Sequence, residues 1–303
     1  MAQLKELSML SVPFDLGAGR RGAADGPAAI LQAGLEQRLR SLGFDVDDAG
    51  TVTYSAPSAS TDSPSSDKLR NLADVAAVNT ELAARVSGIV SAGRYPLVLG
   101  GDHSIAIGTI AGLSPHYRKL GVIWIDAHSD LNTAETTESG NIHGMSLRVA
   151  LGEGDERLTR IGGEGPKIRP ENVVLIGGRQ LDPGEKAYIK ANNITCFTMH
   201  DVDRRGMSQV MEEAIRIAAS GTDGVHLSFD IDSVDPGEAP GTGTPVHGGL
   251  SYREAHLALE LLNESGIITS AEFVELSPAY DHAGRTTNLT LELICSLLGE
   301  RIL

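Results

Sequence analysis

One stretch decides the fold: Gly121-Val122-Ile123-Trp124-Ile125-Asp126-Ala127-His128-Ser129-Asp130. It begins as an apolar run and ends with a metal-capable side chain at every second position. On an extended backbone, side chains at every second position point the same way. We therefore expect a buried strand over residues 122–126, with Asp126, His128 and Asp130 lining one wall where it ends.

A second stretch follows the same pattern, Val225-His226-Leu227-Ser228-Phe229-Asp230-Ile231-Asp232. Here an apolar strand ends in two acids, Asp230 and Asp232. Burying an unpaired carboxylate is costly in free energy. Two strand ends of this kind require a counter-charge, and a pair of metal ions would supply it.

Apolar runs of strand length recur along the chain, mostly with helical patterns between them. Strands are expected over residues 7–12, 44–47, 96–99, 122–126, 173–176, 194–198, 225–230 and 267–275. Helices are expected over residues 27–43 and 69–93, from residue 104, and over 185–191, 207–220, 252–264 and 287–298. This alternation predicts an α/β fold built on a mainly parallel sheet that is covered on both faces.

Two segments interrupt the alternation. Residues 54–67 are polar and broken by prolines, which indicates a surface loop, and residues 152–169 form a glycine-rich, charged connection. Because the alternation resumes after the first of these, we expect no domain boundary there. The chain is predicted to form a single domain over residues 1–303.

In an open parallel sheet, ligands bind beyond the carboxyl ends of the strands. Chemically capable residues follow four of the expected strands, and we expect them to meet at one edge of the sheet. The expected metal ligands are two histidines and four aspartates: His103, Asp126, His128, Asp130, Asp230 and Asp232. Glu275 ends the last strand at the same edge.

Carboxylates with some imidazole suit Mn²⁺, Mg²⁺ or Fe²⁺ better than metals that prefer thiolates. Four carboxylates balance the charge of two divalent ions. Two-metal sites hold their ions about 3.5–4 Å apart and activate a bridging water. Hydroxide attack on a planar carbon is the reaction that such a centre favours. The alternative is that these residues only cap helices, but their recurrence at several strand ends argues against it.

The roles of two further residues stay open on the sequence alone. His143 either relays protons, since the ordinary pKa of histidine lies near neutrality, or makes ordinary hydrogen bonds at a helix start. Glu275 either clamps a guanidinium group with both oxygens or belongs to a buried structural ion pair.

The formal net charge is −15, which argues against a basic surface for nucleic acid. An acidic protein either attracts a cationic substrate or is simply kept soluble by its charge. The chain has two cysteines, an N-terminus without the shape of a signal peptide, and no apolar run of membrane-spanning length. We expect a cytoplasmic protein without a membrane partner.

One motif would indicate a different function, the binding of a dinucleotide. Gly17-Ala18-Gly19-Arg20-Arg21-Gly22 fits the dinucleotide-binding pattern G-x-G-x-x-G and follows an expected strand. In that motif the glycines open the helix directly, whereas here the helix is expected to begin at Pro27. We interpret the run as a flexible loop at the same sheet edge.

Three segments resemble the metal motifs of the ureohydrolases: Gly100-Gly101-Asp102-His103-Ser104, Asp126-Ala127-His128-Ser129-Asp130 and Ser228-Phe229-Asp230-Ile231-Asp232-Ser233-Val234-Asp235-Pro236. The resemblance runs nearly end to end. It implies a three-layer α/β/α fold with a mainly parallel eight-stranded sheet, two Mn²⁺ ions per chain, and assembly into trimers or hexamers. Co²⁺ or Fe²⁺ would suit the same ligands.

Within that family the loop over residues 130–144 is similar to the form found in arginases. The resemblance implies that Asn132, Thr137 and Ser139 contact the α-carboxylate of the substrate, and that Asp182 helps hold its α-amino group. Glu185 and Thr244 lie in matching segments and complete the expected substrate contacts.

The resemblance implies hydrolysis of L-arginine to L-ornithine and urea, by attack of a metal-bridged hydroxide on the guanidinium carbon. Asp126 and Asp230 would bridge two ions, with His103 and Asp130 on one of them and His128 and Asp232 on the other. Three residues would have catalytic roles: Glu275 would orient the guanidinium, Asp130 would pass a proton to the departing amine, and His143 would relay protons to solvent.

Two alternatives remain. Gln180 stands where many arginases have an aspartate, and the last strand continues as Glu275-Leu276-Ser277-Pro278 rather than as the Glu-Val-Asn-Pro of many arginases. The first alternative is therefore a ureohydrolase that acts on agmatine, guanidinobutyrate or a related guanidine. The second is a catalytically inactive metal-binding protein on the same fold.

Overall fold

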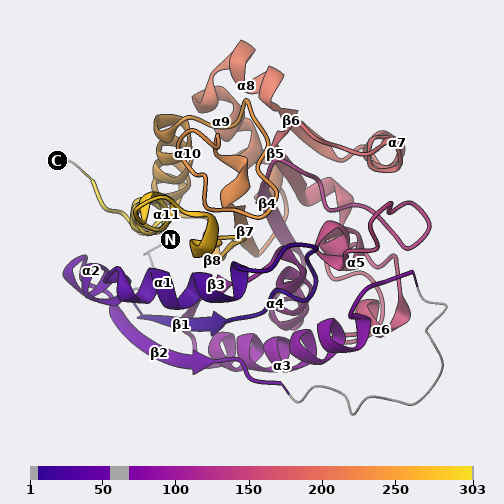
Figure 1. Ribbon diagram of the computed structural model, residues 1–303, viewed down its shortest axis with the longest axis horizontal. Coiled ribbons are helices and arrows are strands. Elements are labelled where there is room, and N and C mark those ends of the chain that lie inside the picture. The colour runs from indigo at the N-terminus through magenta and orange to yellow at the C-terminus, as the bar shows by residue number, and fades with distance from the viewer. Residues whose placement is uncertain (1–5, 55–67, 302–303) are drawn as a thin grey trace.

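The computed structural model describes residues 6–54 and 68–301. Its centre is one eight-stranded sheet in the order β2-β1-β3-β8-β7-β4-β5-β6 (Figure 1). The strands are β1 (Glu6–Val12), β2 (Asp45–Thr51), β3 (Tyr95–Gly100), β4 (Leu120–Ile125), β5 (Val173–Gly178), β6 (Thr195–Thr198), β7 (Gly224–Asp230) and β8 (Ile268–Val274). All neighbouring strands pair in parallel, so the predicted fold class is confirmed.

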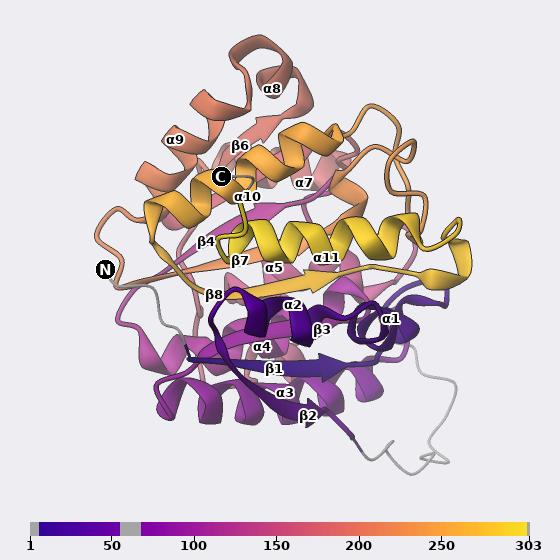
Figure 2. The same cartoon turned by 90° about the vertical axis from the view of Figure 1, so that its left-hand side faces the viewer.

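Helices cover both faces of the sheet, which gives three layers (Figures 1 and 2). One face packs against α1 (Gly26–Gln32), α2 (Leu35–Ser41), α8 (Met199–Arg205), α9 (Met207–Ala218), α10 (Tyr252–Ser265) and α11 (Arg285–Leu297). The other packs against α3 (Leu72–Ser91), α4 (Ala106–Leu113), α5 (Ser146–Ala150) and α6 (Glu156–Thr159), with α7 (Pro183–Ala191) at its margin. Successive strand residues alternate between these two cores because their side chains point to opposite faces.

The helix expected over residues 27–43 is wrong as a single element. Gly34 separates α1 from α2, and its φ of 98° is a left-handed conformation that a continuous right-handed helix excludes. The apolar stripe is nevertheless shared, since Ile30 and Leu39 are buried in the same core. Sequence periodicity therefore located the buried face but not the break.

Three short helices, α5, α6 and α8, were not predicted. They are 5, 4 and 7 residues long, too short for an apolar period to stand out. The polar segment over residues 54–67 lies outside the described residues, apart from Tyr54. Among the described residues, no helix has the length and apolar character that a transmembrane span needs.

The four strands that carry the expected site residues, β3, β8, β7 and β4, are adjacent at the centre of the sheet. Since all four run in parallel, their carboxyl ends meet at one edge. The predicted convergence of four strand ends is therefore confirmed.

The expected extended wall after β4 is wrong in detail. The strand ends at Ile125, and the residues that follow form a turn and a loop. Asp130 has a φ of 52°, which is uncommon for a residue other than glycine. Glu275, one residue after β8, is likewise left-handed with a φ of 64°. Conformations of this kind cost about 1–3 kcal/mol each and cluster at functional sites.

Candidate metal centre

His103 is the first residue of a short 3-10 turn that follows β3. The chain reaches this position through Gly101, where a Cβ atom would lie 1.7 Å from the carbonyl oxygen of Phe14, so only glycine fits. The His103 side chain is 1% exposed, and its ring stacks on Trp124 with centroids 4.1 Å apart. The imidazole is thus held rigidly beneath the sheet edge.

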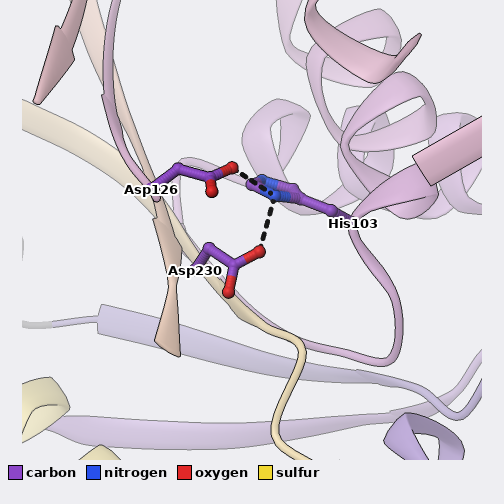
Figure 3. Close-up of side chains that lie close together, drawn as sticks. All are labelled: His103, Asp126 and Asp230. Atoms are coloured by element: carbon purple, nitrogen blue, oxygen red, sulfur yellow. Dashed lines mark hydrogen bonds and ion pairs between the residues drawn. The ribbon is translucent and has the colours of Figure 1, made fainter. Parts of the chain in front are cut away.

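Three carboxylates surround one nitrogen of this ring, and Figure 3 shows two of them, Asp126 and Asp230. His103 Nδ1 lies 3.2 Å from Asp126 Oδ2, 3.2 Å from Asp130 Oδ2 and 3.1 Å from Asp230 Oδ2. A ring nitrogen carries at most one hydrogen, so it donates fully to only one of these oxygens. Burial alone would lower the pKa of His103, but Asp126, Asp230 and Asp130 together raise it well above its ordinary value. The arrangement demands more positive charge than one imidazolium supplies.

Asp130 shows the same deficit of positive charge. Its Oδ2 is buried without a hydrogen-bond partner in the part of the chain that the structure describes. Burial, and then the charge of Asp126, raise the pKa of Asp130 well above its ordinary value. A bound cation would reverse this effect and keep the carboxylate ionised.

A second group lies beside the first and consists of Asp126, His128 and Asp232. His128 Nδ1 is 3.1 Å from Asp232 Oδ2 and 3.4 Å from Asp126 Oδ1. Asp232 is further fixed by the hydroxyl of Thr244, which donates to its Oδ2 at 3.0 Å. In contrast to His103, the His128 side chain is 24% exposed. Burial would lower the pKa of His128, but Asp232 and Asp126 raise it far above its ordinary value.

Two metal ions fit these residues. Within each group, His103–Asp126–Asp230 and Asp126–His128–Asp232, one ligand atom per residue lies within 4.8 Å of the others, and Asp126 belongs to both groups. Clustered oxygen donors with one imidazole on each side match hard or borderline divalent cations. Asp230 is grouped only with the His103 side, so its expected bridging role stays a prediction.

His143 and Glu275 form a pair next to this centre. His143 Nδ1 lies 3.0 Å from Glu275 Oε1, and the same oxygen accepts from the backbone N–H of His103 at 2.9 Å. Burial would lower the pKa of His143, but Glu275 raises it to about 9. The described contacts pair a partly exposed His143 with a buried Glu275, and the expected roles of both residues in catalysis stay predictions.

A cavity of about 170 Å³ opens above the centre. Ten predicted site residues line it: His128, Asp130, Asn132, Ser139, His143, Asp182, Glu185, Asp230, Asp232 and Thr244. Gln180 lines it as well. The structure does not place His103, Asp126, Thr137 or Glu275 on this lining.

Two residues predicted to contact the substrate have their polar atoms committed to the backbone. Thr137 Oγ1 accepts from the N–H of Gly140 at 3.0 Å. Glu185 accepts from the N–H of Leu131 at 3.0 Å with one oxygen and from that of Asp182 at 2.8 Å with the other. In this arrangement both side chains shape the loop around the cavity.

Comparisons with known proteins agree with this geometry. The sequence model described as "Arginase family" matches residues 5–299. The arginase of Bacillus caldovelox is 54% identical over 300 residues, which cover 99% of this chain and 100% of that protein.

The chain belongs to the Arginase family.

Solved structures of arginases have the same fold as this family member. That of the Bacillus caldovelox enzyme covers 99% of this chain and 100% of its own with a TM-score of 0.95. Entamoeba histolytica arginase in complex with L-ornithine is 35% identical, with a TM-score of 0.89 over 98% of this chain and 100% of that one. Membership makes the chain a hydrolase, as the sequence predicts.

Sequence reasoning missed the role of Asp102 in this family member. Asp102 is fully buried, and its Oδ2 accepts from the N–H groups of Gly17 and Ala18 at 2.7 and 3.0 Å. The backbone N–H of His143 donates to the oxygen of Gly17 at 3.2 Å. The glycine-rich run therefore lies at the edge of the site, as expected, and α1 begins only at Gly26. The signal that could have revealed Asp102 was its position directly before His103.

Arg179, one residue after β5, was also missed. Its guanidinium donates to four backbone carbonyl oxygens, those of Gly177, Asp232, Ser233 and Val246. These contacts fix both ends of the segment that carries Asp232 and Thr244. A charged residue three positions after the strand predicted over residues 173–176, at the edge where the site lies, was a signal for Arg179 too.

Proposed function

We propose that this chain is an arginase, which hydrolyses L-arginine to L-ornithine and urea with two Mn²⁺ ions bound by His103, Asp126, His128, Asp130, Asp230 and Asp232. The observation that carries the proposal is the pair of ligand groups that share Asp126 beneath an acidic cavity. Two ions bound there would make hydroxide available near neutral pH, because they lower the pKa of a shared water to about 7.

The chain's own residues orient the substrate. The cavity lining offers carboxylates at Asp130 and Asp182 to a cationic substrate and polar groups at Asn132 and Ser139 to its α-carboxylate. Asn132 and Asp182 are joined by a hydrogen bond of 2.9 Å, so they act as one rigid unit. Glu275 holds the guanidinium through Oε2, since its other oxygen accepts from His103 and His143.

Proton movement is assigned to two of these residues. Asp130, which lies beside His103 Nδ1, passes a proton to the departing amine. His143 lines the cavity and its side chain is 17% exposed, so it exchanges protons between the site and solvent. A histidine charged near neutral pH is suited to deliver a proton to ornithine as it leaves.

The remaining expectations belong to the same proposal. One sheet runs through the described chain from β1 to β8, which supports a single catalytic domain over residues 1–303. Cys196 and Cys295 are free thiols, as suits the reducing environment of the cytoplasm. Assembly into trimers or hexamers is tested by light scattering of the metal-loaded protein.

Urea release from several guanidines tests the proposed substrate. Metal-free protein is loaded with Mn²⁺ and supplied with L-arginine, agmatine or guanidinobutyrate at equal concentration. We expect L-arginine to be turned over at least about tenfold faster, because only it carries both groups that the Asn132–Asp182 side of the cavity is built to bind. Preference for agmatine would assign the chain to another ureohydrolase activity, and no urea from any guanidine would indicate an inactive protein.

A further inference from the structure

A row of polar side chains crosses the interior of the two central strands. His226 and Ser228 on β7 face Ser270 and Glu272 on β8, because the strands pair in that register. All four residues are 0% exposed. They point to the sheet face covered by α3 and α4, whereas the residues between them pack into the opposite core. Burying polar and charged side chains costs free energy unless they form hydrogen bonds or ion pairs.

Hydrogen bonds connect this row to the metal centre. His103 Nε2 lies 2.8 Å from Ser228 Oγ, and Ser228 Oγ donates to Glu272 Oε1 at 2.8 Å. On the far side, His226 Nε2 lies 3.4 Å from Glu272 Oε1, and His226 Nδ1 lies 2.9 Å from Ser270 Oγ. A hydrogen-bonded path therefore runs from Glu272 through Ser228 to the His103 ring, whose other nitrogen faces Asp126, Asp130 and Asp230.

The direction of these hydrogen bonds is fixed by chemistry. An ionised carboxylate only accepts, so Ser228 must give its single hydroxyl hydrogen to Glu272. Ser228 then has only lone pairs for His103, so the hydrogen lies on His103 Nε2. In a neutral imidazole this leaves a bare lone pair on Nδ1, the nitrogen that faces the three carboxylates.

We propose that Ser228 and Glu272 are positioning residues that hold His103 in the tautomer and orientation required to bind a metal ion. The inference rests on the proposed metal centre and extends it into the sheet. Hydrogen-bond partners of this kind are known to affect metal affinity by about 10–100-fold. The Ser228–Glu272 pair acts on the His103 side alone, since Asp232, on the other side, is held by Thr244.

The burial of Glu272 argues against a purely structural role. Breaking a buried ion pair is destabilising, but a well-packed apolar pair in its place is often equally stable. Glu272 Oε2 is buried without a hydrogen-bond partner among the described residues, so the carboxylate is not arranged for the greatest stability. The other oxygen, Oε1, accepts at 2.8 Å from the hydroxyl of Ser228, which itself contacts the metal ligand His103.

The test measures metal affinity of metal-free protein by competition with a chromophoric chelator. A His128→Asn background isolates the ion on the His103 side, and a His103→Asn background isolates the other. Ser228→Ala and Glu272→Gln are placed in each background, with Thr244→Val as the matched control. Glu272→Gln keeps the size and shape of the side chain, but an amide can donate as well as accept a hydrogen bond. Ser228 is then no longer forced to donate its hydrogen to residue 272, and His103 is no longer forced to carry its hydrogen on Nε2.

We expect Ser228→Ala and Glu272→Gln to weaken Mn²⁺ binding on the His103 side by about 10–100-fold and on the His128 side by less than about threefold. Thr244→Val should weaken Mn²⁺ binding more on the His128 side than on the His103 side. Ser228→Thr, which keeps the hydroxyl, should restore affinity. The melting temperature of each metal-free variant reports on folding.

Two results would overturn the inference: equal weakening on both sides, or unchanged affinity on the His103 side in the isosteric Glu272→Gln variant. A wrong arginase proposal would be recognised by a different result. If metal binding follows the expected pattern but no guanidine yields urea, the arginase proposal is wrong and the positioning role stands.

Discussion

The two histidines of the metal centre have opposite surroundings. His103 is 1% exposed, stacks on Trp124, and contacts Ser228 through Nε2, the ring nitrogen that faces away from the carboxylates. His128 has a side chain that is 24% exposed and lines the cavity. The His103 half of the centre is thus contacted from within the sheet, whereas the His128 half lies at the cavity. We call the His103 side the inner half and the His128 side the outer half, and we expect an ion bound as proposed to exchange more slowly from the inner half.

The largest effect is expected where the two halves share a ligand. Asp126→Asn should abolish tight binding of both ions, because Asp126 belongs to both groups. Removing one charge from a buried ionic cluster costs about 3–5 kcal/mol, which corresponds to a loss of affinity of about 100-fold or more. Metal content after dialysis measures this loss. Retention of one ion per chain would show that the halves are independent.

The next largest effect is expected on the stability of the metal-free protein, where substitution of His103 and of His128 should differ. In metal-free protein the His103 ring lies within 3.2 Å of three buried carboxylates, whereas His128 lies near two and is partly exposed. His103→Asn should therefore lower the free energy of unfolding by about 3–5 kcal/mol, and His128→Asn by clearly less. Urea denaturation at neutral pH compares them. Equal losses would remove the distinction between an inner and an outer half.

A pH-dependent effect is expected at the His143–Glu275 pair beside the inner half. In the folded, metal-free protein the pKa of His143 is raised from 6.5 to about 9, mainly by Glu275 acting against burial. The stabilisation is therefore complete below pH 6.5 and disappears as the pH rises through 9. His143→Asn should cost about 3 kcal/mol at pH 6 and little at pH 10. A cost that does not vary with pH would contradict the pairing.

The smallest effect is expected at the outer half. Thr244→Val removes one hydroxyl that donates to Asp232, a neutral-to-charged hydrogen bond worth about 1.5–3 kcal/mol. Because the site is open to solvent, water replaces part of this bond, and Mn²⁺ affinity should fall by about tenfold at most. Calorimetric titration in the His103→Asn background measures the fall. A loss as large as that caused by Asp126→Asn would mean that the outer half is as rigid as the inner.

Much of the sheet and most of the residues that meet in the candidate metal centre could be predicted because they depend on local signals. Apolar runs of strand length identified all eight strands, and the acids and histidines that follow such runs include the residues of the two candidate metal-binding groups. The break at Gly34 could not be read, since an apolar stripe continues across it. The left-handed backbone of Asp130 and Glu275 was equally hidden, because neither residue type requires it.

The supporting residues could not be predicted because their roles arise from register. Ser228 and Glu272 are 44 residues apart, and only the pairing of β7 with β8 places them side by side. Taken alone, each is a polar residue inside an apolar strand. Arg179 is similar, since its role depends on carbonyl groups more than 50 residues away. Patterns within one strand carry no information on such contacts.

The most direct test of the arginase proposal is a titration of metal-free protein with Mn²⁺, in which binding and urea release from L-arginine are followed together. The account predicts two ions per chain, with the tighter one bound first on the His103 side and full activity only when the second is bound. Full urea release at one ion per chain, or two bound ions without urea release, would contradict it.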